Sequence, residues 1–277
     1  MFLLQSYDAL RTGAAFVRRI DRGVLKVTGE DRVTWLQGLL TNDVLAIPVG
    51  QRGYSAWLTP QGRMITDLWV VVGEDHVLLD VPAPLAARLR DRLDALIFAE
   101  DVRVEDVSGE IDIVWFGGTD HYVARGQRAG LPAIETDLDV FDVLRIEAGI
   151  PKFLVDMDEH TIPLEAGIED RAISYTKGCY VGQEVIVRVT TRGQGRVAKR
   201  LVGLAVKKGT VPISVGAPIT ADDREIGRVT SAAMSPALGR AIALGYVHRD
   251  FTDPGTEVRV AGEIAVVSVL PFVAPSH

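Results

Sequence analysis

The chain has 277 residues, of which 47% are hydrophobic and 24% are charged. This balance is typical of a folded globular protein and excludes intrinsic disorder, and the length favours two domains. The formal net charge of −7 argues against a surface devoted to nucleic acid, so no strong nucleic-acid binding is expected.

Cysteine and histidine are used sparingly. A single cysteine, Cys179, excludes an internal disulfide, and the absence of a CxxC motif or a Cys/His cluster argues against a zinc site. His160 has acidic neighbours, but consecutive side chains point in different directions, so no metal is expected there. The start "MFLLQSYDAL" is too short in apolar residues for a signal peptide, and no long uncharged apolar run follows. We therefore expect a cytoplasmic protein with no membrane segment.

The N-terminal part alternates strand-like and helix-like patterns. In chain order, we expect a strand over 23–29, a helix over 30–40, a hairpin of 53–59 and 64–72, a strand over 76–81, a helix over 82–96, strands over 102–107 and 111–116, and a helix over 139–149. The turn "PQGR" joins the hairpin strands, and Pro82 and Pro84 open the second long helix. This order predicts an α+β fold of antiparallel sheet with helices on one face.

The sequence pattern changes from mixed helix and strand to strand alone near Arg200. Six short segments rich in β-forming residues follow, separated by Gly, Pro and Asp turns: 201–206, 216–220, 225–234, 240–247, 256–260 and 263–270. We predict a small β-barrel or sandwich there. The expected division is therefore 1–200 for the α+β region, with two subdomains, and 201–277 for the β domain.

Two carboxylates occur in apolar surroundings. Asp67 lies inside the strand over 64–72, and strand alternation places it on the same face as Ile65 and Trp69. It is either satisfied within the fold or faces a pocket. Glu147, in "RIEAGIP", either decorates a helix beside Arg145 or offers two oxygens to a paired-donor edge such as that of a pterin.

The segment "KGCYVGQE", residues 177–184, contains the single cysteine between Gly178 and Gly182. Lys177 would favour the thiolate of Cys179. The alternative is a small buried side chain in a tight loop, and no triad supports a protease-like nucleophile. Residues 185–221 lack Asp and Glu, and they form either a solvated face or an anion-binding rim. The basic residues of this run are Arg188, Arg192, Arg196, Lys199, Arg200, Lys207 and Lys208.

With these residues in view, nearly the whole chain resembles the folate-binding proteins related to the glycine cleavage T protein, the aminomethyltransferase. "RIEAGIP", "DMDEHTIPLEAG" and "GRMITDLWV" are similar to segments of the aminomethyltransferases, and "KGCYVGQE" is similar to the signature of the YgfZ branch. The resemblance implies a ring-like α+β arrangement around a tetrahydrofolate site, with a C-terminal β-barrel.

The resemblance also implies roles for individual residues. Asp67 occupies the place of the carboxylate beside the folate nitrogen that receives the one-carbon unit, and Glu147 borders the same cavity. Cys179 is the residue on which YgfZ function would most depend, so it is expected with Asp67 to carry the chemistry. The signature-loop residues expected to contact folate are Lys177, Tyr180, Gln183 and Glu184, with Arg188 receiving the glutamate tail.

The function implied by the signature is that of a tetrahydrofolate-binding YgfZ-type protein that supports iron–sulfur cluster assembly or repair and, downstream, tRNA modification. Its partners would include iron–sulfur assembly proteins. The alternative is an aminomethyltransferase that transfers a one-carbon unit to tetrahydrofolate, so whether the chain is an enzyme stays open. Phe141 and Asp80 depart from the arginine and asparagine usual in the transferases. A third reading, an RNA-binding module that uses the basic run, conflicts with the overall acidity.

Overall fold

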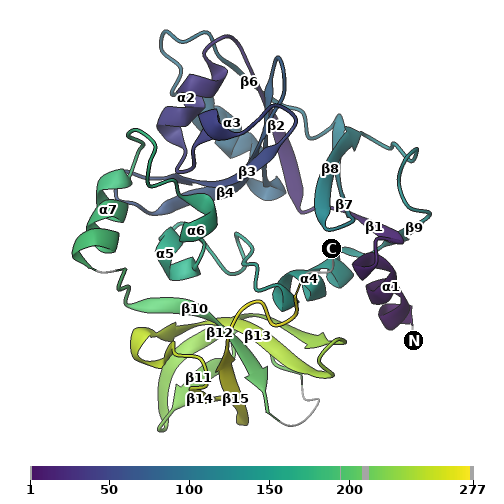
Figure 1. Cartoon of the computed structure of the whole chain (residues 1–277), viewed down its shortest axis with the longest axis vertical. Coiled ribbons are helices and arrows are strands. Elements are labelled where there is room, and N and C mark those ends of the chain that lie inside the picture. The colour runs from purple at the N-terminus through teal and green to yellow at the C-terminus, as the bar shows by residue number, and fades with distance from the viewer. Residues whose placement is uncertain (1, 194, 208–211, 275–277) are drawn as a thin grey trace.

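The computed structural model describes residues 2–193, 195–207 and 212–274 (Figure 1). The first sheet is antiparallel, with its strands in the order β3-β4-β5-β2-β6. Its strands are β2 (Arg22–Thr28), β3 (Arg52–Leu58), β4 (Met64–Val72), β5 (Val77–Pro82) and β6 (Arg103–Asp106).

Helices α2 (Arg32–Leu39) and α3 (Ala86–Asp94) pack on one face of this sheet. Leu89 and Leu93, four residues apart on α3, are both buried against the sheet, as the amphipathic pattern predicts. Short 3₁₀ turns precede β3 and α3, at η1 (Val44–Ala46) and η2 (Ala83–Leu85).

The second sheet has the order β8-β7-β1-β9. Its strands are β1 (Ala15–Arg18), β7 (Ile111–Phe116), β8 (Thr119–Ala124) and β9 (Ile134–Thr136). Helices α1 (Phe2–Arg11) and α4 (Leu138–Glu147) pack together beside it around Tyr7, Leu10 and Val140. The pair β1 and β9 is parallel, so the expectation of a wholly antiparallel α+β layer is wrong at this edge.

Four short helices cover the other face of the β3-β4 hairpin: α5 (Pro163–Ala166), α6 (Glu169–Ala172), α7 (Gln183–Val187) and the π-helix η3 (Arg188–Arg192). Gly182 begins α7 with a φ of 86°, and a Cβ at this position would lie 2.6 Å from the carbonyl oxygen of Thr59. Only glycine fits so close to the hairpin turn. The first sheet therefore has helices on both faces, and the prediction of helices on one face is corrected here.

The described residues from Lys199 onward form a closed barrel in the order β10-β13-β12-β11-β14-β15. The strands are β10 (Lys199–Val206), β11 (Pro218–Ala221), β12 (Arg224–Ser235), β13 (Arg240–His248), β14 (Glu257–Val260) and β15 (Glu263–Ser268), with a 3₁₀ turn η4 (Arg249–Phe251). The barrel is filled by alternate apolar residues such as Leu204, Ala243 and Val260.

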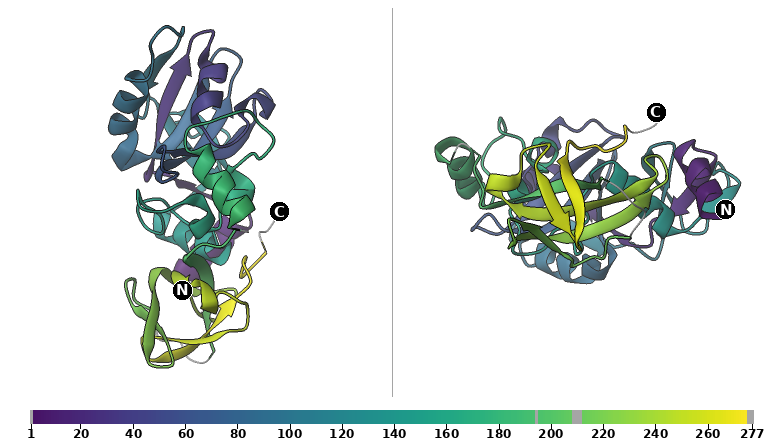
Figure 2. Two further views of the ribbon diagram at one scale, coloured as in Figure 1. Left: turned by 90° about the vertical axis from the view of Figure 1, so that its left-hand side faces the viewer. Right: turned by 90° about the horizontal axis from the view of Figure 1, so that it is seen from below.

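The three units meet around α4. Figure 1 shows the first sheet above, the second sheet to one side and the barrel below, and Figure 2 shows the first sheet and the barrel at opposite ends of the molecule. Helix α4 contacts β12 of the barrel and packs with α1. The predicted α+β fold with a C-terminal barrel is confirmed. None of the helices in the described ranges is long and apolar enough to cross a membrane.

Candidate functional site

A cavity of about 240 Å³ lies where the first sheet, the second sheet and α4 meet. Its walls carry aromatic rings, three carboxylates and six cationic side chains. The aromatic residues are Tyr54, Trp69, Trp115 and Phe141. The charged residues are Arg19, Arg22, Arg52, Asp67, Asp80, Asp120, Arg145, Lys152 and Arg171. An aromatic, net cationic hollow favours a flat ligand that carries negative charge.

Asp67 faces this cavity from β4. Its carboxylate accepts a 2.9 Å hydrogen bond from the Tyr54 hydroxyl and a 3.3 Å hydrogen bond from Nη1 of Arg22. Burial and the charge of Asp67 raise the pKa of Tyr54 well above its ordinary value, so its hydroxyl keeps its proton and donates. Asp67 is therefore held in place by side chains from two other strands of the sheet, β3 and β2.

Ile65 does not lie on the same strand face as Asp67, although the sequence predicts that it does. A β-bulge near Met64 shifts the register between β3 and β4. Ile65 consequently packs in the core against α2 and α3, whereas Asp67 and Trp69 face the cavity. The predicted alternation is correct for Trp69 and wrong for Ile65, because a bulge interrupts the two-residue period.

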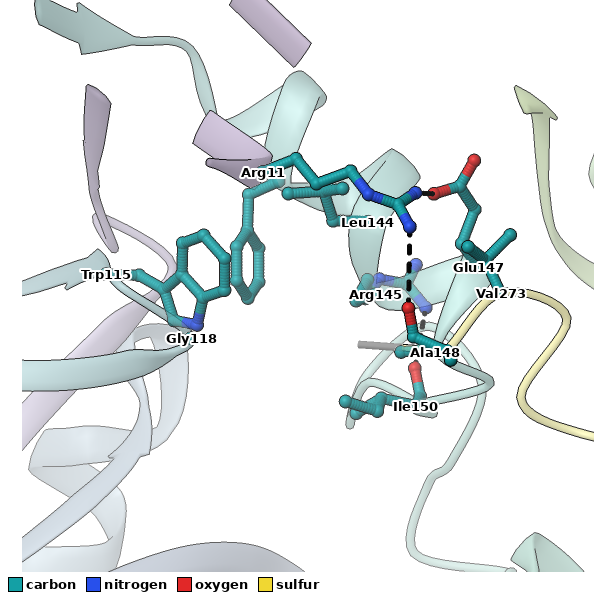
Figure 3. A pocket seen from close by; sticks show the side chains of 11 residues that line it. Arg11, Trp115, Gly118, Leu144, Arg145, Glu147, Ala148, Ile150 and Val273 are labelled. Carbon is teal, nitrogen blue, oxygen red and sulfur yellow. Dashed lines mark hydrogen bonds and ion pairs between the residues drawn. The ribbon is translucent and has the colours of Figure 1, made fainter. Parts of the chain in front are cut away.

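Glu147 lines an adjoining hollow of about 140 Å³ together with Arg11 and Trp115 (Figure 3). Trp115, Phe141 and Arg145 line both hollows. It is 2% exposed, and both of its oxygens accept hydrogen bonds, one from Tyr7 at 2.7 Å and one from Ser235. Arg11 lies 3.8 Å away. Burial and the bond to Glu147 raise the pKa of Tyr7 to about 12. Glu147 thus joins α1, α4 and the barrel at the edge of the cavity.

Phe141, at the position where the resemblance expects an arginine, forms the wall between the two hollows. Its ring makes an edge contact with Trp115 at a centroid distance of 5.4 Å, and the guanidinium of Arg19 lies 4.1 Å from its centroid. A positive charge therefore still reaches this part of the cavity, although it comes from a residue that follows β1.

The signature loop of residues 177–184 lies against the turn of the β3-β4 hairpin, where Gly182 comes close to Thr59. Cys179 is exposed and has no disulfide, whereas Tyr180 is buried with the short helices. Gln183, Glu184 and Arg188 belong to α7 and η3. The two hollows beside Asp67 and Glu147 have no lining residue from this loop. A direct contact of these residues with folate stays a prediction.

Lys177 has a structural task in this loop. Its ammonium group donates to the carbonyl oxygens of Gln37, Leu40 and Asn42 at 2.6, 2.7 and 2.8 Å. These carbonyls lie at the end of α2, where the helix leaves acceptors unsatisfied and where its dipole favours a cation. Burial lowers the pKa of Lys177 to about 8. The loop is thereby fixed to the first sheet unit.

Replacing Lys177 with Met is expected to lower the free energy of unfolding by about 3 kcal/mol, because one buried and two partly buried carbonyl groups lose a charged donor. Urea denaturation followed by tryptophan fluorescence measures this change. Arg188→Met is the control, since the Arg188 side chain is exposed and has no ion pair within the described ranges. A Lys177→Met variant as stable as this control would contradict the structural role.

Asp21 fixes two of the cavity cations from outside. Its oxygens lie 3.0 Å from Nε of Arg19 and 3.1 Å from Nζ of Lys152. Burial alone would raise its pKa, but Arg19 and Lys152 together lower the pKa of Asp21 to about 2. The cations on this side of the cavity are therefore held by a carboxylate that remains ionised at neutral pH.

Asp21→Asn is expected to cost about 2 kcal/mol of stability at pH 7, because a pKa lowered from 3.8 to about 2 stabilises the folded state by that amount. The unfolded chain takes up the proton first as the pH falls. The contribution is therefore complete well above pH 3.8 and disappears as the pH approaches 2. Urea denaturation of both proteins between pH 7 and pH 2.5 tests this, and a stability difference that does not depend on pH would contradict it.

The sequence analysis does not identify several of the cavity residues as site residues, among them Tyr54, Arg22, Arg52 and Asp120. Arg52 of β3 and Arg19 both bind Asp120 of β8, at 2.7 and 3.2 Å, across the junction of the two sheets. Asp80 could have been identified from the sequence, because it is a lone carboxylate inside the apolar strand β5. In the structure it is 1% exposed.

The fold and the cavity define a mixed α+β protein with a ligand-sized hollow at its centre and a closed barrel at one end. Residues 2–120 match the GCVT N-terminal domain, and residues 199–273 match the glycine cleavage T-protein C-terminal barrel domain. The chain therefore contains both domains of the glycine cleavage T-protein superfamily, the superfamily of the aminomethyltransferases.

Curated relatives agree with this assignment. An aminomethyltransferase of Rippkaea orientalis is 26% identical over 98% of this chain and 89% of its own length. An aminomethyltransferase of Thermosynechococcus vestitus is 28% identical over 93% of this chain and 83% of its own length. The crystal structure of glycine cleavage system aminomethyltransferase T from Bartonella henselae matches with a TM-score of 0.86, at 21% identity, over 99% of this chain and 90% of that one. At this identity the structural match shows a shared fold.

Proposed function

We propose that the protein binds tetrahydrofolate in the central cavity and transfers a one-carbon unit to it, as an aminomethyltransferase. The observation that carries the proposal is the buried carboxylate of Asp67 in a hollow walled by aromatic and cationic side chains. The names of the relatives support this choice over the YgfZ reading. The division at 1–200 and 201–277 and a cytoplasmic location remain part of the proposal.

The residues of the cavity fit the chemistry of tetrahydrofolate. The rings of Tyr54 and Trp69, with centroids 5.1 Å apart, offer apolar surface for a flat pterin. Arg171 lies over Tyr54, with its guanidinium carbon 5.2 Å from the ring centroid, and has no ion pair among the described residues. Such an arginine suits a glutamate carboxylate of the ligand.

Asp67 would act on the nitrogen of tetrahydrofolate that receives the one-carbon unit. That nitrogen loses a proton when it bonds to the one-carbon unit and the bond of that unit to its donor breaks, and a carboxylate beside the nitrogen can accept the proton. The Tyr54 hydroxyl and Arg22 hold the carboxylate in position during this step.

Titration with tetrahydrofolate, followed by tryptophan fluorescence, tests the binding proposal. Trp69 and Trp115 line the cavity, whereas Trp35 and Trp57 lie in the core between the first sheet and its helices. A saturable signal that is diminished in Trp69→Phe and Trp115→Phe but retained in Trp35→Phe is expected. A tetrahydrofolate titration that leaves the fluorescence unchanged, with no heat of binding by calorimetry, would refute the proposal.

The second candidate is the YgfZ-type function in the assembly or repair of iron–sulfur enzymes, with tRNA modification downstream. The exposed thiol of Cys179 favours it, because the thiol lies outside the cavity-lining residues and is accessible to a partner protein. Arg188 and Arg192 nearby on η3 make no ion pair within the described residues, so they are available to an acidic partner.

Two measurements separate the candidates. A transferase forms methylene-tetrahydrofolate from an aminomethylated lipoyl carrier, and Cys179→Ser retains this activity. A YgfZ-type protein supports iron–sulfur enzyme activity in cells that lack their own copy, and Cys179→Ser abolishes that support. If Cys179→Ser equals the parent in cells, the second candidate is excluded.

A further inference from the structure

A chain of hydrogen bonds joins five side chains at the wall of the cavity. Tyr54 donates to Oδ2 of Asp67 at 2.9 Å, and Nη1 of Arg22 donates to Oδ1 at 3.3 Å. Nε of Arg22 donates to Oδ1 of Asp80 at 2.5 Å, and Tyr122 donates to Oδ2 of Asp80 at 2.9 Å. We call these five residues the Asp67 network. They come from five strands, and Tyr122 belongs to the second sheet.

The network divides one guanidinium between two carboxylates unequally. Arg22 binds Asp80 through two short contacts, since Nη2 also donates to the Asp80 carbonyl at 2.7 Å. Its contact with Asp67 is single and longer, at 3.3 Å. The side chains of Arg22, Asp80 and Asp67 are 8%, 1% and 7% exposed. The N–H groups that Arg22 directs to Asp80 are not available to Asp67, so the two carboxylates compete for the close contacts of one guanidinium.

We infer that Arg22 and Asp80 are positioning residues that set the proton affinity of Asp67. Arg22 gives the Asp67 carboxylate one hydrogen bond, and Asp80 limits this contact by taking the shorter ones. A carboxylate bound by both arms of an arginine would be a weak base, whereas one with no cation beside it would hold its proton. The inference rests on the proposed function, in which Asp67 must be both ionised and able to accept a proton.

Most of the other cations around the cavity are bound to carboxylates outside the Asp67 network. Arg19 and Arg52 are bound to Asp120, and Lys152 is bound to Asp21. Arg145 is bound to Asp156. Arg171 is the remaining cavity cation, and it lies over the Tyr54 ring. Replacing Arg22 or Asp80 by a neutral residue therefore changes the charge beside Asp67 while these other pairs keep their partners.

The pH profile of kcat for methylene-tetrahydrofolate formation tests the inference. Arg22→Gln is expected to move the acidic limb upward by about one pH unit, because Asp67 loses its neighbouring cation. Asp80→Asn is expected to move the same limb downward, because Arg22 is released to bind Asp67 more closely. Arg22→Lys retains the charge and should restore much of the parent profile. A purely structural role would lower activity without moving the limb in opposite directions.

A second readout does not depend on turnover. The carboxyl carbon of Asp67, labelled with ¹³C and assigned with Asp67→Asn, reports its titration by NMR in the parent and in both variants. Opposite shifts in Arg22→Gln and Asp80→Asn support the inference even if no transfer is detected, in which case the proposed function alone fails. Equal shifts, or none, overturn it. If Arg22→Gln does not fold, the comparison of Asp80→Asn and Arg22→Lys with the parent decides.

Discussion

An Asp67→Asn variant is expected to lose one-carbon transfer by about 10²–10⁴-fold, the usual effect of removing a general base. The amide is nearly the same size as the carboxylate and still offers an oxygen to the Tyr54 hydroxyl, so the cavity keeps its shape. Tetrahydrofolate should therefore still bind, and the loss should appear in kcat. Methylene-tetrahydrofolate formation and a tryptophan-fluorescence titration on the same preparation measure the two quantities separately.

The matched control is Asp75→Asn, which removes a carboxylate with a side chain that is 88% exposed. This variant should transfer the one-carbon unit as fast as the parent. Full turnover in Asp67→Asn would remove Asp67 from the chemistry. Loss of both turnover and folate binding would instead assign it to ligand recognition.

The long elements and one cavity carboxylate could be predicted because their signals are local. Helix α3 and strand β4 carry regular apolar periods, and Asp67 is conspicuous inside an apolar strand. The prediction that Ile65 shares a face with Asp67 is wrong because of a β-bulge. The bulge depends on how β3 pairs with β4, and a local apolar pattern gives no sign of it. Helices of four or five residues, such as α5 and α6, are too short to show a helical period.

Most of the charged site depends on long-range pairing, which composition does not reveal. Arg22 and Asp80 are 58 positions apart, and Arg52 and Asp120 are 68 apart, yet each pair forms a direct contact. In the signature loop, a motif assigned to function also has a structural role. The sequence suggests that Lys177 favours the thiolate of Cys179, and in the structure Lys177 also donates to the carbonyl oxygens at the end of α2. A motif can thus carry a structural requirement beside a functional one.

Arg145 connects the N-terminal units with the barrel, and its removal is expected to have the largest effect on stability. Its guanidinium donates to Asp156 at 2.8 Å and to the Ser231 hydroxyl of β12 at 2.9 Å. The Asp156 side chain is fully buried. Arg145→Met should lower the free energy of unfolding by about 3–5 kcal/mol, because the carboxylate of Asp156 stays buried without its cation.

The hydrogen bond from Arg145 to Ser231 joins α4 to the barrel. Arg145→Met is therefore also expected to separate one unfolding transition into two, with the barrel unfolding apart from the sheets. Urea denaturation followed by tryptophan fluorescence and by far-ultraviolet circular dichroism shows this directly, since all four tryptophans precede the barrel. Arg90→Met, which removes an exposed pair with Asp91, should stay within about 0.5 kcal/mol of the parent. Coincident transitions and a loss no larger than that of this control would mean that Arg145 does not hold the units together.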